Sequence, residues 1–110
     1  NVELIRGNMK KFVPEFGKVK EQQQLDDKTS VVVENSYQNH TVIATKLHYE
    51  ERFRVASMAE ARDKVDELTL RIENDDSLIN PSIRYDGRAR ISYKGSFDVV
   101  FEYTKIKQVK

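Results

Sequence analysis

Residues 41–55 read TVIATKLHYEERFRV, and residues 56–74 read ASMAEARDKVDELTLRIEN. In the first segment, apolar side chains fall mainly on odd positions and charged or polar side chains on even positions. This alternation predicts a strand with one buried and one solvated face. Glu51 is the exception on the odd positions and indicates a bulge or a frayed edge. In the second segment, apolar residues recur every three or four positions, which predicts an amphipathic helix.

The predicted helix has recognisable ends. Ser57 and Glu60 form an S-x-x-E capping box, in which each side chain accepts a hydrogen bond from a backbone donor at the helix start. Asn74 indicates a left-handed C-terminal stop. Asp75 and Asp76 follow, although acids at this end oppose the helix dipole, so we expect another demand to place them there. The apolar stripe consists of Met58, Ala61, Val65, Leu68 and Ile72.

A second apolar group lies in RARISYKGSFDVVFEY, residues 88–103. We predict a hairpin with its turn near residues 94–96, because pairing Tyr93 with Phe97 brings the apolar faces together. The aromatic residues then form the seat of the helix, and the arginines lie on the opposite face. A base-stacking platform needs both on one exposed face. The predicted pairs are Ile91 with Val99, Ala89 with Phe101, Arg90 with Val100 and Arg88 with Glu102.

The N-terminal part is less regular. Residues 17–29 are polar and predict a loop or a mobile arm, whereas residues 30–34, SVVVE, predict a strand. Residues 77–82, SLINPS, predict a loop restrained by Pro81. We therefore divide the chain into an N-terminal arm or peripheral element, residues 1–29, and an α+β core domain, residues 30–110.

The expected fold class is α+β, with a four- to five-stranded antiparallel sheet and one main helix packed on one face. A five-stranded barrel of the oligonucleotide-binding type has the same order of elements if residues 12–20 add a strand.

Composition narrows the classes of function. The chain has 110 residues, 34% of them charged and none of them cysteine, with a net charge of +1. Disulfides and thiolate zinc sites are therefore excluded. No apolar run approaches a membrane span, and no signal peptide is recognisable. We expect a cytoplasmic protein or a component of a viral particle, without a membrane partner.

Groups suited to catalysis do not converge in the sequence. The two histidines are His40, in a predicted turn, and His48, on the solvated face of the predicted strand. Glu50 and Glu51 are adjacent on a strand and should point to opposite faces, which makes them a poor acid and base pair. We predict no catalytic residue, no metal site and no cofactor.

Charge is segregated along the chain. Residues 57–76 carry seven acids against three bases, and residues 84–110 carry seven bases against three acids. This pattern is typical of an acidic helix beside a basic hairpin. It also fits a basic face for an anionic partner, or charge matching between subunits.

Two resemblances bear on function. FRVASMAEA, residues 53–61, followed by NPSI, residues 80–83, loosely resembles the pattern of pterin-4a-carbinolamine dehydratases. That family has paired active-site histidines before the proline, whereas Ile79 and Asn80 precede Pro81 here, so its chemistry does not carry over. The strand–helix–hairpin plan is also similar to small tail-terminator and connector proteins of tailed phages, which implies a role in assembly.

We expect a non-enzymatic protein–protein binding or assembly module, a small structural or adaptor subunit that binds a protein partner or itself. The long strand and the terminal strand are expected to offer edges for β-augmentation. The alternative is a single-stranded nucleic-acid-binding protein, and a small enzyme comes third. The candidate contacts of the arm are Leu4, Ile5, Phe12 and Val13. The candidate partner or nucleic-acid contacts are Arg52, Arg54, Arg88, Arg90 and Lys94.

Overall fold

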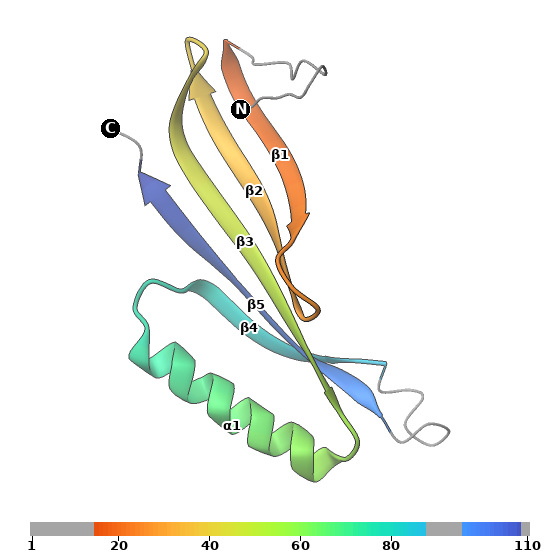
Figure 1. The fold of residues 1–110 in the computed structure, drawn as a ribbon. Coiled ribbons are helices and arrows are strands. Elements are labelled where there is room, and N and C mark those ends of the chain that lie inside the picture. The colour runs from red at the N-terminus through yellow and green to blue at the C-terminus, as the bar shows by residue number, and fades with distance from the viewer. Residues whose placement is uncertain (1–14, 88–95, 109–110) are drawn as a thin grey trace.

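The computed structural model describes residues 15–87 and 96–108. Five strands form one open antiparallel sheet in the order β1-β2-β3-β5-β4, and a helix packs on one of its faces (Figure 1). The α+β prediction is confirmed. Because β1 and β4 lie at opposite edges, the sheet does not close into the barrel considered as an alternative. The elements are β1 (Phe16–Gln24), β2 (Thr29–Gln38), β3 (Thr41–Val55), α1 (Met58–Asn74), β4 (Ile79–Asp86) and β5 (Phe97–Gln108).

The central strand β3 is continuous over its 15 residues, as the alternation predicts. The bulge predicted at Glu51 is wrong, because Glu51 stays in register with Thr29 on β2 and with Phe101 on β5. The register shifts instead lie between Ser36 and Tyr37 and within β4. Glu51 is tolerated on the buried face because the helix supplies a charged partner for it, as described below.

The capping box of α1 is confirmed. The Ser57 hydroxyl accepts a 3.2 Å hydrogen bond from the Glu60 amide, and the Glu60 carboxylate accepts one of 2.8 Å from the Ala56 amide. The left-handed stop at Asn74 is wrong, because the helix ends through Asp75 in an extended conformation. The Asp75 carboxylate accepts hydrogen bonds from the amide and hydroxyl of Ser77, and this local turn redirects the chain.

The helix stripe packs on the sheet as expected. Ala61 and Leu68 are fully buried, and the other three members of the stripe are half-buried against the same cluster. The β5 residues predicted for the core are also buried. Helix and sheet thus exclude water together, which is the main stabilising contribution expected in a domain of this size. The buried cluster consists of Val55, Ala61, Leu68, Phe97, Val99, Phe101 and Tyr103.

The predicted strand partner of β5 is wrong. Val99, Val100, Phe101 and Glu102 pair with residues 82–85 of β4 on one side and with β3 on the other, so residues 88–91 cannot pair there. The chain reaches the sheet at residue 79, soon after the helix ends, and INPSIRYD places half-buried side chains at alternate positions. The loop predicted for residues 77–82 is therefore wrong from residue 79 onward. Pro81 is tolerated because β4 is an edge strand. Tyr93 and the first two residues of the predicted turn, Lys94 and Gly95, lie outside the described residues.

Residues 16–24 form the edge strand β1, where the sequence predicts a loop or arm. β1 pairs with β2 along its whole length. The connecting turn is held by the Asp26 carboxylate, which accepts 2.8 Å hydrogen bonds from the amides of Lys28 and Thr29. All of β1 is exposed except Val19, which is half-buried. A strand that is solvated on both faces shows no apolar alternation, and so its sequence does not resemble a strand.

The described molecule is elongated, with extents of 52 × 31 × 19 Å. The helix lies on β3, β4 and β5 and covers only one half of the long sheet (Figure 1). We call the other half, residues 16–24, 29–38, 41–49 and 103–108, the blade. In residues 15–87 and 96–108, no helix is long and apolar enough to cross a membrane.

Candidate functional site

His48 links three strands on the sheet face opposite α1. The register places it between β2 and β5. Its Nε2 lies 3.0 Å from Oε1 of Glu34, and its Nδ1 lies 2.9 Å from Oγ1 of Thr104. Lys18 of β1 lies 3.5 Å from the other Glu34 oxygen. The hydrogen bond with His48, followed by that with Lys18, holds the pKa of Glu34 below its usual range, although burial raises it.

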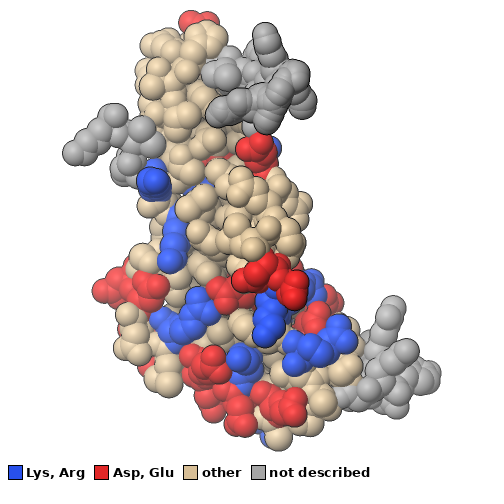
Figure 2. All heavy atoms as spheres, in the orientation of Figure 1, with Lys and Arg blue, Asp and Glu red and all other residues tan. Residues whose placement is uncertain are grey.

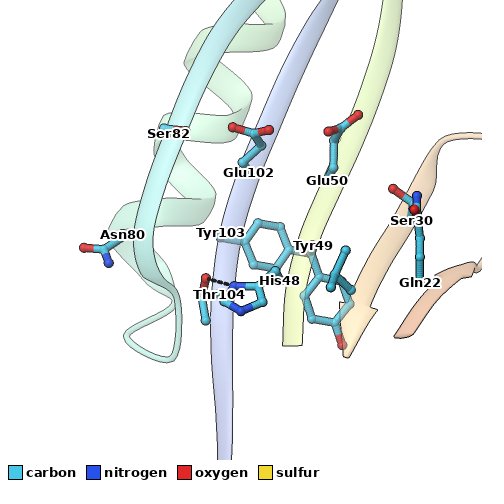
Figure 3. Close-up of a pocket in the computed structure, with 11 residues that line it drawn as sticks. Gln22, Ser30, His48, Tyr49, Glu50, Asn80, Ser82, Glu102, Tyr103 and Thr104 are labelled. Atoms are coloured by element: carbon cyan, nitrogen blue, oxygen red, sulfur yellow. Dashed lines mark hydrogen bonds between the residues drawn. The ribbon is translucent and has the colours of Figure 1, made fainter. Parts of the chain in front are cut away.

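The neighbouring row of side chains forms a shallow polar cleft. Glu50 and Glu102 lie directly opposite each other on β3 and β5, between Ser30 of β2 and Ser82 of β4 (Figure 3). The cleft has a volume of about 320 Å³. Like charges opposite each other destabilise a sheet. Each carboxylate here contacts a guanidinium, Arg52 at 2.7 Å from Glu50 and Arg84 at 3.4 Å from Glu102. The other lining residues are Gln22, Val32, His48, Tyr49, Asn80, Tyr103 and Thr104.

The line of Thr104, His48 and Glu34 has the order of a nucleophile, a base and an orienting acid. Acyl transfer also requires donors aimed at the oxyanion that develops beside the nucleophile. The Thr104 side of the cleft instead carries the carboxylates of Glu50 and Glu102. Negative charge there opposes an oxyanion, so this arrangement supports a polar cross-link between strands better than catalysis.

Arg52 and Arg54 lie farther along the same face and are paired with acids. One Arg52 nitrogen, Nη1, donates to Asp86 at 2.8 Å and to Asp98 at 2.9 Å. Arg54 Nε donates to Asp98 at 2.7 Å. The hydrogen bond to Glu50, followed by that to Asp86, raises the pKa of Arg52 further above its usual range. The acids of β4 and β5 thus balance most of the positive charge at these two predicted contact residues.

A second ion pair fastens the end of α1 to the sheet. Arg71 donates to both carboxylate oxygens of Glu51, at 2.7 and 3.1 Å, and the Tyr103 hydroxyl donates to Oε2 of Glu51. Burial raises the pKa of Glu51, but the hydrogen bonds from Arg71 and Tyr103 outweigh it and lower the pKa overall. Burial, followed by the bond to Glu51, raises the pKa of Tyr103 to about 12. This cluster marks the boundary between the covered half and the blade. Glu50 lies on the sheet face opposite to that of Glu51, as predicted.

The blade has an incompletely covered apolar surface on the side that carries α1. Val33 and Leu47 are cross-strand neighbours there, and both are half-buried. Ile43, farther along β3 where the register with β2 shifts, is 43% exposed. Lys105, beside Leu47, lies over this surface, with its Nζ 5.9 Å from the ring centroid of Tyr49 and 6.0 Å from that of Tyr103. In the view of Figure 2, charged side chains crowd the half that contains α1, whereas most of the blade is uncharged.

The sheet order changes the predicted sites for β-augmentation. The long strand β3 is interior, so the prediction that it offers an edge is wrong. The terminal strand β5 lies between β3 and β4, and only its residues 105–108 extend past β4. The open edges of the described sheet belong to β1 and β4.

The other predicted contacts fall outside residues 15–87 and 96–108. These residues are Leu4, Ile5, Phe12, Val13, Arg88, Arg90 and Lys94. Their role stays a prediction.

Sequence reasoning missed the polar cross-links of the sheet. Glu34, Asp98 and Thr104 have no recognisable local signal, since their partners lie on strands distant in sequence. Only the strand order identifies them. Within the part of the chain that the structure describes, no group of three or more His, Asp or Glu side chains is arranged to hold a metal ion.

Comparison with protein-family models, with curated protein sequences and with solved structures finds no significant match to this chain.

Proposed function

We propose that this chain is a non-enzymatic protein-binding module that works through its sheet, as a small structural or adaptor subunit of a larger assembly. The observation that carries the proposal is the blade. The sheet extends well past its only described helix (Figure 1), and within residues 15–87 and 96–108 no second layer packs on the blade. Protein domains usually bury each sheet face that continues an apolar core against another layer.

The edge strand β1 supports the same proposal. It is 9 residues long and runs without a proline or a register shift. Natural edge strands are usually shortened, kinked or charged, because an unpaired row of amides and carbonyls recruits another strand. In β1 the lysines Lys18 and Lys20 supply some of that protection, whereas residues 22–24 are uncharged glutamines. A partner protein could dock on the blade face or pair with this edge.

The polar face supports binding over catalysis and over nucleic-acid recognition. Its imidazole is engaged on both nitrogens, and its cleft carries two opposed carboxylates. Arg52 and Arg54 share Asp98, and Arg52 also pairs with Glu50 and Asp86, so the two arginines present little net positive charge to a phosphate backbone. We therefore propose that the protein-binding surface lies in the blade. The host assembly is a cytoplasmic complex or a viral particle.

Site-specific photo-crosslinking tests this function. A benzoylphenylalanine placed at Gln23, on the exposed strand β1, reports contacts of the blade in cells of the source organism. The same group placed at Asp63, on the exposed side of α1, is the matched control. We expect protein adducts from Gln23 and none from Asp63. Adducts with nucleic acid would support the alternative function, and a complete lack of adducts at Gln23 would contradict the proposal.

A further inference from the structure

We propose that the open edge of β1 binds an extended, acidic segment of a partner protein as an added strand of the sheet, with acidic side chains at alternate positions of that segment. This inference rests on the proposed protein-binding function and names the surface and the chemistry of the partner. Strand addition of this kind takes its affinity from main-chain hydrogen bonds and its specificity from alternate side chains.

β1 is the more regular of the two open edges of the described sheet (Figure 1). The other edge, β4, carries Pro81 and a register shift between Ile79 and Ser82, and both features hinder pairing with a further strand. β1 has neither feature, and its nine residues pair with β2 in one uninterrupted register. It therefore offers the longer straight row of backbone donors and acceptors.

Both ends of β1 are fastened to turns. At its start, the Glu15 carbonyl accepts a 3.4 Å hydrogen bond from the His40 amide in the turn between β2 and β3. At its end, the Gln24 side chain donates to the carbonyls of Asp26 and Thr29, at 2.6 and 3.2 Å. Because the edge is ordered before a partner arrives, binding loses less free energy to ordering it.

The side chains of β1 give the edge its preference for acids. Lys18 and Lys20 are exposed and lie on the sheet face opposite α1. Across the strands of this face, Glu34 of β2 lies between Lys20 and Lys46 of β3. Buried Glu34, 3.5 Å from Lys18, is thus one carboxylate among three lysines. The positive charge that it does not balance lies at the open edge, where an acidic strand would complement it.

The other face of β1 limits where the acids of the partner can lie. Val19 and Glu21 alternate with the lysines and point to the α1 side of the sheet. A carboxylate opposite Glu21 would meet a like charge, which destabilises a sheet. A strand that fits β1 therefore carries acids at every second residue and apolar or neutral residues between them.

A second copy of this chain fits the edge poorly. Two antiparallel β1 strands that pair about their midpoint bring Lys20 against Lys20, and an axis at Val19 brings Lys18 against Lys20. Like charges directly opposite each other are unfavourable. The lysines thus protect the edge from self-association and leave it open to an acidic strand.

Titration of the full chain with synthetic peptides tests the inference. The probe is a blocked peptide of alternating glutamate and valine, as long as β1, and its control has lysine in place of glutamate. We expect the acidic peptide to bind at low salt with a dissociation constant of about 10–100 μM, since one edge is smaller than a standard interface. It should protect from hydrogen exchange the β1 amides that face away from β2. The lysine peptide should bind at least about tenfold more weakly.

A second control peptide separates strand pairing from loose charge attraction. Replacing the central valine of the acidic peptide by proline keeps every carboxylate but interrupts the ladder. This peptide should bind more weakly and protect fewer amides, and binding equal to that of the acidic peptide would overturn the added strand. A full chain whose edge is closed by its own residues 1–14 or by a second copy would bind neither peptide, and that result would also overturn the inference.

Charge reversal in the protein provides a matched pair of variants. Lys18→Glu/Lys20→Glu should weaken binding of the acidic peptide at least about tenfold and strengthen binding of the lysine peptide. Arg62→Glu/Lys107→Glu is the control, because it changes the net charge equally at exposed residues of α1 and β5, away from β1. It should change either affinity less than about threefold. Equal losses in the two double variants would overturn the inference, and the three peptides on the unchanged chain decide it if a variant does not fold.

The titration and the crosslinking experiment separate this inference from the proposed function. Protein adducts at Gln23 from a chain that binds no acidic peptide would keep the binding function and overturn the acidic edge. A chain with neither adducts nor peptide binding would contradict both. Adducts that are lost in Lys18→Glu/Lys20→Glu and kept in the control variant would support both.

Discussion

The half of the sheet beneath α1 and the blade differ in burial although they share continuous strands. Beneath the helix, Phe97, Val99 and Phe101 are at most 2% exposed. In the blade, Val31 and Tyr103 next to the helix-covered half are still buried, but Val33 and Leu47 farther out are only half-buried on the same face. Backbone pairing is the same in both halves, so the covering layer accounts for the difference. The comparison teaches that this sheet is longer than its one described helix can bury, and we propose that the excess is the surface for a partner.

The largest expected change in stability is in the half of the sheet that α1 covers. Leu68 is 0% exposed in the core, and Leu68→Ala should lower the free energy of unfolding by about 2–5 kcal/mol through lost burial and a cavity. The matched control is Leu70→Ala on the same helix, because Leu70 is 58% exposed. It should change stability by less than about 0.5 kcal/mol. Urea unfolding measures both. Equal losses in the two variants would mean that α1 does not pack as described.

The next largest change in the free energy of unfolding is expected at the boundary between the covered half and the blade. Arg71→Met leaves the Glu51 carboxylate without its cation. We expect a loss of about 1–3 kcal/mol, reduced from the fully buried case because Arg71 is partly solvated. Arg84→Met is the control, since the side chains of Arg84 and of its partner Glu102 are 46% and 40% exposed, and it should cost about 0–1 kcal/mol.

A double-mutant cycle sharpens this test. Glu51→Leu combined with Arg71→Met should be less destabilising than the sum of the two single changes, because no unpaired charge remains. Urea unfolding of the unchanged chain, the two single variants and the double variant gives the coupling free energy between Glu51 and Arg71. Strictly additive losses would show that the ion pair does not fasten the helix end.

A smaller and pH-dependent effect is expected in the blade. The pKa of Glu34 is lowered from its usual 4.5 by His48 and Lys18. A carboxylate with a lowered pKa contributes stability that is complete above its usual pKa and is lost as the pH falls through the lowered value. Protection of β2 amides from hydrogen exchange, corrected for intrinsic rates, should therefore fall below pH 4.5. Glu34→Gln should reduce this protection at neutral pH and flatten its acid dependence. An unchanged acid profile would contradict the role given to Glu34.

The smallest expected effect concerns nucleic acid. Five cations contacting a single strand would give a log–log salt slope of about −3.5, at roughly −0.7 per phosphate. Because Glu50, Asp86 and Asp98 together balance the charge of Arg52 and Arg54, we expect no tight binding to a random oligonucleotide at about 0.15 M salt. Fluorescence anisotropy of a labelled oligonucleotide at several salt concentrations measures the affinity and its salt dependence. Sub-micromolar affinity that is lost in Arg88→Glu/Arg90→Glu would move the function from assembly to nucleic-acid binding.

Local sequence patterns were enough to predict β3, α1 and the core residues of β5. The alternation of residues 41–55 predicted β3 with its observed bounds. The capping box at Ser57 and the apolar spacing predicted α1, and the β5 aromatics were correctly assigned to the core. These signals are readable because one face of each element is buried and the other is solvated, which imposes a period on the sequence.

The candidate site was less predictable. The opposed orientation of Glu50 and Glu51 follows from strand geometry and was predicted correctly. The acid partners of Arg52 and Arg54 were not, because Asp86 and Asp98 are 34 and 46 residues away from Arg52 and become neighbours only through the sheet order.

Sequence by itself thus determined the fold class, the long central strand, the helix with its start, and the apolar residues of the core. Tertiary structure alone decided which strand pairs with β5, since residues 79–86 and residues 88–93 both contain apolar and charged residues in strand-like patterns. It also decided that residues 16–24 form an edge strand, and that Glu51 belongs in the sheet opposite Arg71. The physical reason is that periodicity records burial against any layer, whereas strand order, ion pairing and the extent of cover depend on which segments the chain can bring together.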